Sequence, residues 1–223
     1  MSSERVAAIA TSRGRHSLVD LAERYALIVS LAAMLAVFSI LRPDTFFTWS
    51  NLSTILGSQA VLVVVTLGLI VPLTANDFDV SIAYVLTLSA MIVAVLNAQL
   101  GWPVWAAASV AIAMGLLVGA INAFFITVFR IHSLIVTLGV GTFLHGVTLW
   151  ISGSMTISGI ANSLMNAVIV WRLFGIPLEF FYALILCAAV WYIFEYTALG
   201  QRMLFVGRGR EVARLSGINT DRM

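Results

Sequence analysis

The chain has 223 residues, of which 61% are hydrophobic and 10% are charged, and its formal net charge is +2. Soluble domains carry about 25% charged residues, so this composition excludes a globular protein with a wetted surface and indicates a polytopic helical membrane protein. Long unbroken apolar runs, in place of residue-by-residue alternation, argue against a transmembrane β-barrel.

The N-terminal segment, residues 1–24, is polar and rich in Arg, and it is predicted to be a cytoplasmic tail. An apolar run, residues 25–41, follows it. A cleavable signal peptide would have a shorter apolar region and would end in small residues. This run ends instead in Arg42-Pro43-Asp44, so we expect an uncleaved first span.

Five further apolar runs are long enough to be drawn as membrane spans, because roughly 20 helical residues cross the hydrocarbon core. They cover residues 55–73, 81–96, 104–129, 134–151 and 178–194. We therefore expect an all-α fold, a polytopic helical bundle over residues 25–195 with about six transmembrane helices.

The distribution of Arg predicts the orientation. With the N-terminus inside, ten Arg fall on the inner side and two on the outer side, as the positive-inside rule requires. Residues 196–223 then form a cytoplasmic loop, in which Arg210–Leu215 (REVARL) reads as a short helix between glycines. This loop either serves only to fix the topology or offers a helix to a soluble partner.

Polar side chains within the apolar part form a second group of candidates, for the pathway or for the structure: Asp77, Asp79, Ser81, Asn122 and Thr137. A carboxylate at membrane depth must reach water, a partner or a helix terminus. Asp79 or Ser81 is suited to capping the following helix, and Asn122 needs a partner in the bundle. A proton relay through the two carboxylates stays open, whereas two acids without His do not form a metal site.

The sequence contains no motif of an enzyme or a cofactor site. All twelve basic residues are Arg, so a phosphate-binding loop, which needs Lys, is absent from this sequence. Neither a Ser/His/Asp set nor an HExxH or CxxC motif is present. We therefore expect a protein that is not an enzyme and holds no cofactor or metal.

Taken in chain order, the motifs resemble those of the membrane permease subunit of ribose-type ABC sugar importers. The resemblance extends over about residues 25–222. It is carried by Asp77-Phe-Asp79-Val-Ser81, Asn122, Arg130-Ile-His-Ser-Leu-Ile-Val-Thr137-Leu-Gly139, Gly153, Gly175-Ile-Pro177, Thr197-Ala-Leu-Gly200, Arg210-Glu211 and Ala213-Arg-Leu-Ser-Gly217-Ile218.

The resemblance implies a permease that forms the translocation pathway in a bacterial inner membrane. Its expected partners are a cytoplasmic ATPase, a periplasmic sugar-binding protein, a second permease subunit in a homodimer, and the bilayer, with no nucleic acid. Permeases of this kind have further spans beyond the cytoplasmic loop, so we expect the chain to be truncated at its C-terminus. The implied ATPase-docking residues are Arg210, Glu211, Ala213, Arg214, Leu215, Ser216, Gly217 and Ile218.

Two other hypotheses stay open from the residues alone. The first is an ion- or proton-coupled secondary transporter that uses Asp77 and Asp79 as coupling carboxylates. The second is a membrane scaffold or assembly protein without a pathway.

Overall fold

The computed structural model describes residues 25–220. The chain divides into two compact units, Met1–Leu52 and Ser53–Met223, and the boundary falls inside a helix. The predicted cytoplasmic tail, residues 1–24, lies outside the described residues, as do residues 221–223.

The first unit contains an apolar helix and a short turn of helix. The helix, Tyr25–Leu41, coincides with the first predicted span. It is followed by α2 (Pro43–Phe46), whose first position is a proline, a residue favoured there because its missing N–H has no partner in that turn anyway. The rings of Phe38 and Phe46 stack with centroids 5.7 Å apart, which ties α2 to the preceding helix.

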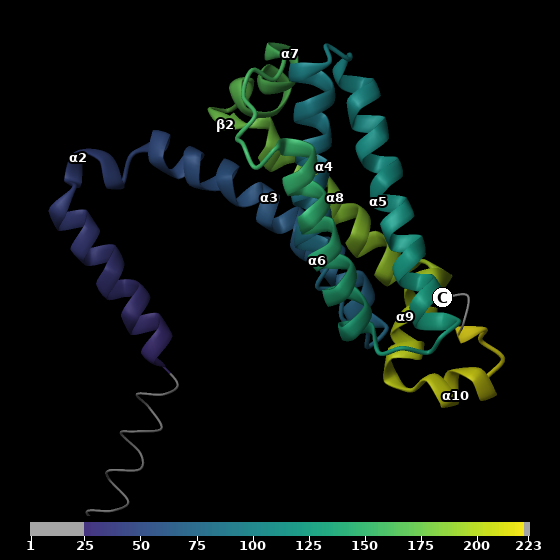
Figure 1. Ribbon diagram of the computed structural model, residues 1–223. Coiled ribbons are helices and arrows are strands. Elements are labelled where there is room, and N and C mark those ends of the chain that lie inside the picture. Colours follow the sequence, from purple (N-terminus) through teal and green to yellow (C-terminus); the bar gives the residue numbers. More distant parts are fainter. Residues whose placement is uncertain (1–24, 221–223) are drawn as a thin grey trace, which may run out of the picture. The chain divides into compact units, whose positions relative to one another are not determined.

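The remaining predicted spans are also helices (Figure 1). They are α3 (Trp49–Thr74), α4 (Ile82–Ala94) with the π-helical turn η1 (Val95–Gln99), α5 (Val104–Thr127), α6 (Ser133–Ser152) and α8 (Leu178–Tyr196). Among the described residues, these five are long and apolar enough to cross a membrane. The expected all-α membrane bundle is therefore confirmed, and each span lies within a few residues of its predicted run.

The packed centre of the second unit is formed by α4, α5 and α6. Leu88, Val118 and Leu144, one from each helix, form its buried apolar cluster. Gly115 and Gly119, four residues apart, lie on one face of α5. Gly115 lies near Val85 of α4, whereas Gly119 has no side chain or backbone within 4 Å of where a Cβ would stand.

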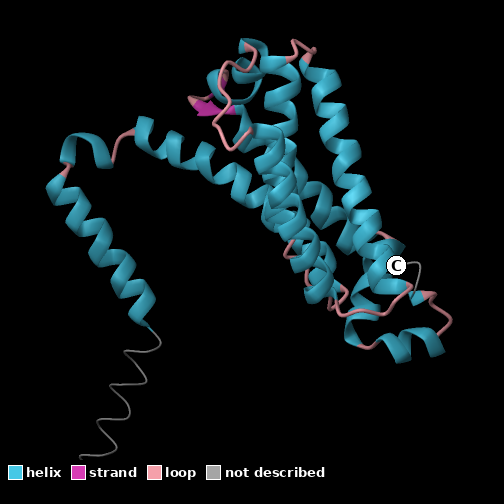
Figure 2. Cartoon of the chain, in the orientation of Figure 1, coloured by secondary structure: helices cyan, strands magenta, loops and turns pink. Residues whose placement is uncertain are grey.

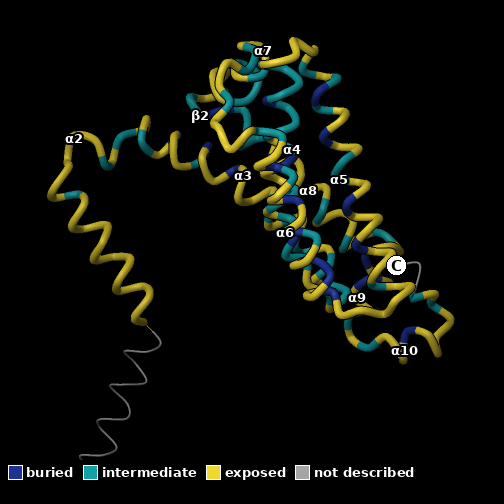
Figure 3. Tube along the Cα trace, viewed as in Figure 1, coloured by how far each residue is buried: buried dark blue, intermediate teal, exposed yellow. Residues whose placement is uncertain are grey.

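Many residues of these helices are exposed (Figure 3), and a large number of the exposed side chains are large and apolar. Within the 18-residue apolar stretch of each helix, 28% is buried in α6 and 6% in α8. A lipid bilayer covers such surfaces at no cost in hydrophobic free energy, so this pattern fits a membrane protein and leaves α8 the least covered of the five.

The segment between α6 and α8 holds the only strands in the described part of the chain, and Figure 2 shows how small they are. β1 (Arg172–Leu173) pairs antiparallel with β2 (Ile176–Pro177). The turn between them has two residues in the left-handed region, Phe174 with φ +54° and Gly175 with φ +80°. Residues 167–171 belong mostly to a π-helical turn, η2 (Asn166–Val170).

Side chains hold this hairpin against the neighbouring elements. The Ser53 hydroxyl donates to the Gly175 carbonyl at 2.5 Å, and Arg172 Nη1 donates to Ser53 Oγ at 3.2 Å. Before the hairpin, the Ala161 N–H near the start of α7 (Asn162–Met165) donates to Asn97 Oδ1 at 2.7 Å. The segments that connect α4 to α5 and α6 to α8 therefore meet at one end of the bundle, which we call the hairpin end.

The opposite end, the α10 end, carries α9 (Ala198–Arg208) and α10 (Arg210–Leu215). The bounds of α10 agree with the predicted short helix. Residues 198–208, predicted only as part of the cytoplasmic loop, form an amphipathic helix, α9. Its buried face consists of Gly200, Met203 and Val206, spaced three residues apart, and the Thr197 hydroxyl at its N-cap accepts from the Gly200 N–H at 3.3 Å.

Candidate functional site

The site is built around the loop between α3 and α4, residues 75–81, at the α10 end of the bundle. This loop is fixed to α6 by side chains. The Phe78 N–H donates to Ser133 Oγ at 3.1 Å and the Val80 N–H donates to Thr137 Oγ1 at 3.2 Å. The Thr137 hydroxyl in turn donates to the Phe78 carbonyl at 3.3 Å. The Thr137 side chain thus makes the hydrogen bonds that a neighbouring strand or a helical turn would otherwise make with the backbone of this loop.

The second half of the loop is fixed to α5 through a chain of hydrogen bonds. Asp79 Oδ1 accepts from the Ser81 N–H at 2.9 Å and from the Ser81 hydroxyl at 2.6 Å. Asn122 Nδ2 then donates to Ser81 Oγ at 2.9 Å. Ser81, at the N-cap of α4, is fully buried and Asn122 is 6% exposed. Asp79 therefore accepts from the N–H of the N-cap residue, whereas Ser81 itself makes no side-chain cap bond to α4. Ser81 is instead the partner of Asn122.

The first half of the loop is joined to α10 by an ion pair between Arg210 and Asp77. It is the one ion pair found within residues 25–220. Arg210 is the first residue of α10, and its side chain is 54% exposed, against 27% for Asp77. The two residues are 133 positions apart in the sequence, so the sequence gives no sign of this pairing.

The placement of α10 depends on how closely α9 approaches the end of α3. A Cβ added to Gly207 would overlap the Thr74 carbonyl oxygen and stand 2.9 Å from its carbonyl carbon. Only glycine allows two backbones to come this close. Gly209 then separates α9 from α10, so that Arg210 begins a new helix beside the α3–α4 loop.

The C-terminus of α10 is closed by a Schellman motif. The Ile218 N–H donates to the Ala213 carbonyl and the Gly217 N–H donates to the Arg214 carbonyl, both at 3.0 Å. Gly217 has φ +82°, a conformation that favours glycine. The motif gives this short helix a defined end without a neighbouring element.

The residues predicted for docking differ in how far they are exposed. Ala213 is fully buried, whereas Leu215 is 86% exposed. The other exposed residues of this group are Arg210, Glu211, Arg214, Ser216 and Gly217, while Ile218 is half-buried.

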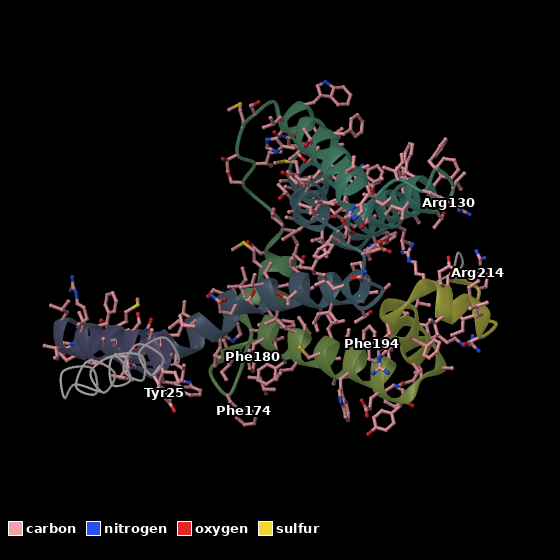
Figure 4. The ribbon with its side chains drawn as sticks, turned by 90° about the horizontal axis from the view of Figure 1, so that it is seen from below. Tyr25, Arg130, Phe174, Phe180, Phe194 and Arg214 are labelled. Carbon is pink, nitrogen blue, oxygen red and sulfur yellow. The ribbon has the colours of Figure 1, made fainter. Side chains whose placement is uncertain are left out.

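A cavity of about 660 Å³ lies between these elements, lined by residues of α3, α5, α6, α9, α10 and the α3–α4 loop. The residues predicted as pathway or structural positions are Asp77, Asp79, Ser81, Asn122 and Thr137. All but Ser81 line this cavity, and Ser81 is bonded to the cavity-lining Asn122. Arg130, in the loop after α5, and Arg214 of α10 also line it (Figure 4). The α3–α4 loop, the loop after α5 and the predicted cytoplasmic loop at residues 196–223 therefore meet at this end.

Sequence reasoning did not single out every residue of the site. Ser133 and Gly207 have defined roles here, and His132 caps α6, its Nδ1 accepting from the Leu134 N–H at 3.3 Å. A polar pair directly before an apolar run is a signal of a helix start, which could have identified His132 and Ser133. No metal-binding group of three or more His, Cys, Asp or Glu occurs in the described part of the chain.

Comparison with known proteins adds a family match and several relatives. The family described as branched-chain amino acid transport system / permease component matches residues 51–223. The D-allose transport system permease protein AlsC of Escherichia coli K12 is 28% identical over 197 residues, which cover 88% of this chain and 60% of that protein. The ribose import permease protein RbsC of the same strain is 28% identical over 200 residues, covering 88% and 61%.

A more distant relative is the xylose transport system permease protein XylH of Escherichia coli K12. It is 22% identical over an alignment that covers 99% of this chain and 72% of that protein. No solved structure matches the chain significantly. The chain spans about 60% of the length of the allose and ribose relatives.

Proposed function

Because the chain belongs to the family of branched-chain amino acid transport system permease components, we propose that it is the membrane-spanning permease subunit of an ATP-driven sugar importer in a bacterial inner membrane. The relatives named for allose, ribose and xylose transport support sugar as the cargo. They also favour an importer of this kind over an ion- or proton-coupled transporter. The permease moves its cargo unchanged, and a separate ATPase supplies the hydrolysis.

The observation that carries the coupling part of this proposal is the form of α10. It is a six-residue helix with a buried Ala213, an exposed Leu215 and a defined end at Gly217. A helix this short is not stable by itself, so its contacts with the bundle must hold it. We assign the exposed residues of the segment from Arg210 to Ile218 as the surface that a cytoplasmic ATPase grips.

The contacts of Arg210 suggest how movement of the ATPase reaches the membrane helices. Arg210 pairs with Asp77 on the α3–α4 loop. That loop is bonded to α6 through Ser133 and Thr137. It is bonded to α5 through the hydrogen-bond chain that ends at Asn122. A displacement of α10 therefore acts on α5 and α6 and on α3 and α4, which the loop joins, as a rigid-body switch between inward- and outward-open states requires.

The remaining partners follow from the same proposal. A periplasmic sugar-binding protein delivers the cargo at the hairpin end, and a second copy of the permease completes the pathway. The expected organisation is a cytoplasmic tail at residues 1–24, a helical bundle at 25–195 and a docking loop at 196–223, with the N-terminus inside.

The test uses full-length permease expressed with its ATPase. Glu211→Ala removes a charge from the outward face of α10, and Gly217→Trp both blocks that face and strains a left-handed position. We expect both variants to co-purify with less ATPase and to lose sugar uptake. Glu195→Ala and Gly101→Trp are matched controls, since Glu195 lies outside α10 and Gly101 also has a positive φ, +68°, with no atoms within 4 Å.

Normal association and uptake in both α10 variants would refute the docking role. Chemical labelling supplies a second test of the topology. A cysteine at position 211 is expected to react only with reagents that reach the cytoplasmic side, and labelling from the outside would overturn the orientation and the proposal with it.

A further inference from the structure

The cavity at the α10 end has the chemistry of a site for a neutral, hydroxyl-rich molecule. Its volume, about 660 Å³, is within the range of small-molecule sites. Three acidic and three basic side chains line it, so their formal charges cancel. They are Asp77, Asp79, Glu211, Arg130, Arg210 and Arg214. A lining of this kind gives no net attraction to either a cation or an anion.

The hydrogen bonds next to the cavity fix the orientation of the Asn122 amide. An ionised carboxylate can only accept hydrogen bonds, so the Ser81 proton must point toward Asp79. Ser81 Oγ is then left to accept, and Asn122 must present its NH₂ group to it, as observed at 2.9 Å. The carbonyl oxygen of the amide, Oδ1, is therefore not bonded to Ser81.

That oxygen has no partner among the described residues, although Asn122 is buried and lines the cavity. Buried polar atoms are paired in the great majority of cases, and an unpaired one calls for an explanation. Next to it, Asp79 uses Oδ1 for both bonds to Ser81, which leaves Oδ2 to accept from elsewhere. One wall of the cavity thus offers two acceptors that need donors.

Other residues that line the cavity offer donors. The His132 Nδ1 accepts from a backbone N–H, so in the neutral ring the proton is on Nε2. His132 and Arg130 both line the cavity. A ligand that satisfies both sides must donate and accept, and each sugar hydroxyl does both.

We propose that this cavity is a binding station for the transported sugar, in which Asn122 Oδ1 accepts a hydrogen bond from a sugar hydroxyl and Asp79 accepts a second one. The inference rests on the proposed function for the identity of the cargo. It adds that the permease itself, and not only a sugar-binding protein, recognises hydroxyl groups. The station lies beside the α3–α4 loop, where a displacement of α10 changes its shape.

The test measures whether sugar shields the cavity. The full-length permease is reconstituted with its ATPase in lipid nanodiscs without nucleotide, with Cys187→Ser removing the native thiol. Ala123→Cys, at a position that lines the cavity, serves as the reporter for a small thiol reagent. D-Ribose, D-allose, D-galactose and D-xylose are added singly at millimolar concentrations, and glycine betaine, which has no hydroxyl group, is the control solute.

We expect the sugar that the same complex takes up to slow the labelling several-fold, and glycine betaine to have no effect. Asn122→Leu is expected to raise the sugar concentration for half-protection by about three- to tenfold, the effect of one lost hydrogen bond. Thr148→Val, which alters a buried polar residue bonded within α6, is the matched control and should leave protection unchanged.

Two outcomes would overturn the station while leaving the proposed function intact. The first is a complex that takes up sugar but shows no protection by any of the four sugars, or equal protection by glycine betaine. The second is equal protection in the wild type and in Asn122→Leu, with both proteins folded and bound to the ATPase. A complex that neither hydrolyses ATP nor takes up sugar would refute the proposed function itself.

Discussion

Replacing Gly207 with alanine tests whether direct backbone contact holds α9, and with it α10, against α3. A Cβ at this position would stand 2.9 Å from the Thr74 carbonyl carbon and 3.4 Å from the Ala75 Cα. Non-bonded carbons prefer separations of about 3.5–4.0 Å. The obstacle is backbone, which has no alternative rotamer, so α9 must move away by at least about 1 Å.

The energetic effect separates into two opposing contributions. Overpacking of this kind costs typically about 1–3 kcal/mol, whereas replacing glycine by alanine within a helix stabilises by about 1 kcal/mol. The free energy of unfolding of Gly207→Ala is therefore expected to fall by up to about 2 kcal/mol. Gly119→Ala provides the reference, because Gly119 is also helical but has no atoms within 4 Å of the new methyl group.

The assay is equilibrium unfolding of the full-length permease in mixed detergent micelles, with both variants measured against wild type. Since the helix-propensity contribution is common to both, their difference isolates the steric cost, about 1–3 kcal/mol with Gly207→Ala the less stable. Equal free energies of unfolding would mean that α9 does not rest on α3 as described.

Three further predictions concern the loop and the hairpin. Asp77→Arg and Arg210→Asp should each lower the amount of sugar taken up per ATP hydrolysed, and the double variant should restore it. Because the pair is partly exposed, its contribution to stability is at most about 1 kcal/mol. A double variant as impaired as the single variants would contradict the coupling role. Thr137→Val should destabilise the permease by about 1–3 kcal/mol in the same unfolding assay, because two backbone groups of the α3–α4 loop lose their partner. The control is Thr142→Val, at an exposed threonine bonded within its own helix, which should change the free energy of unfolding by less than about 0.5 kcal/mol. Phe174→Gly should stabilise by about 1 kcal/mol, because the left-handed conformation at φ +54° is costly for a side-chain residue, and a lower stability would show that the phenylalanine side chain contributes more than the strain costs.

The membrane helices were predictable because each needs its own run of apolar residues, and that requirement is local. The short helix Arg210–Leu215 was predictable for a similar reason, since glycines bound it on both sides. The α9 helix was not recognised, although Met203 and Val206 show the helical spacing of a buried face. Arg202 and Arg208 within the same stretch made it read as a solvated loop.

The site was predicted as residues but not as an arrangement. The need of Asp77 and Asp79 for partners follows from the cost of an unpaired charge at membrane depth, and both have them. Which partner each one finds depends on tertiary structure. The approach of Gly207 to Thr74 brings Arg210 to Asp77, and no local pattern encodes a contact between two backbones.

The side-chain bonding of the α3–α4 loop has a consequence for hydrogen exchange. The amides of Phe78, Val80 and Ser81 belong to a connecting segment, yet each donates to a side chain of the bundle or the loop. They should exchange with deuterium slowly, on the timescale of the helices that hold them, in a segment where rapid exchange is the ordinary expectation. The same amides would then become sensitive reporters of transport, because any step that separates α6 from the loop exposes them to solvent.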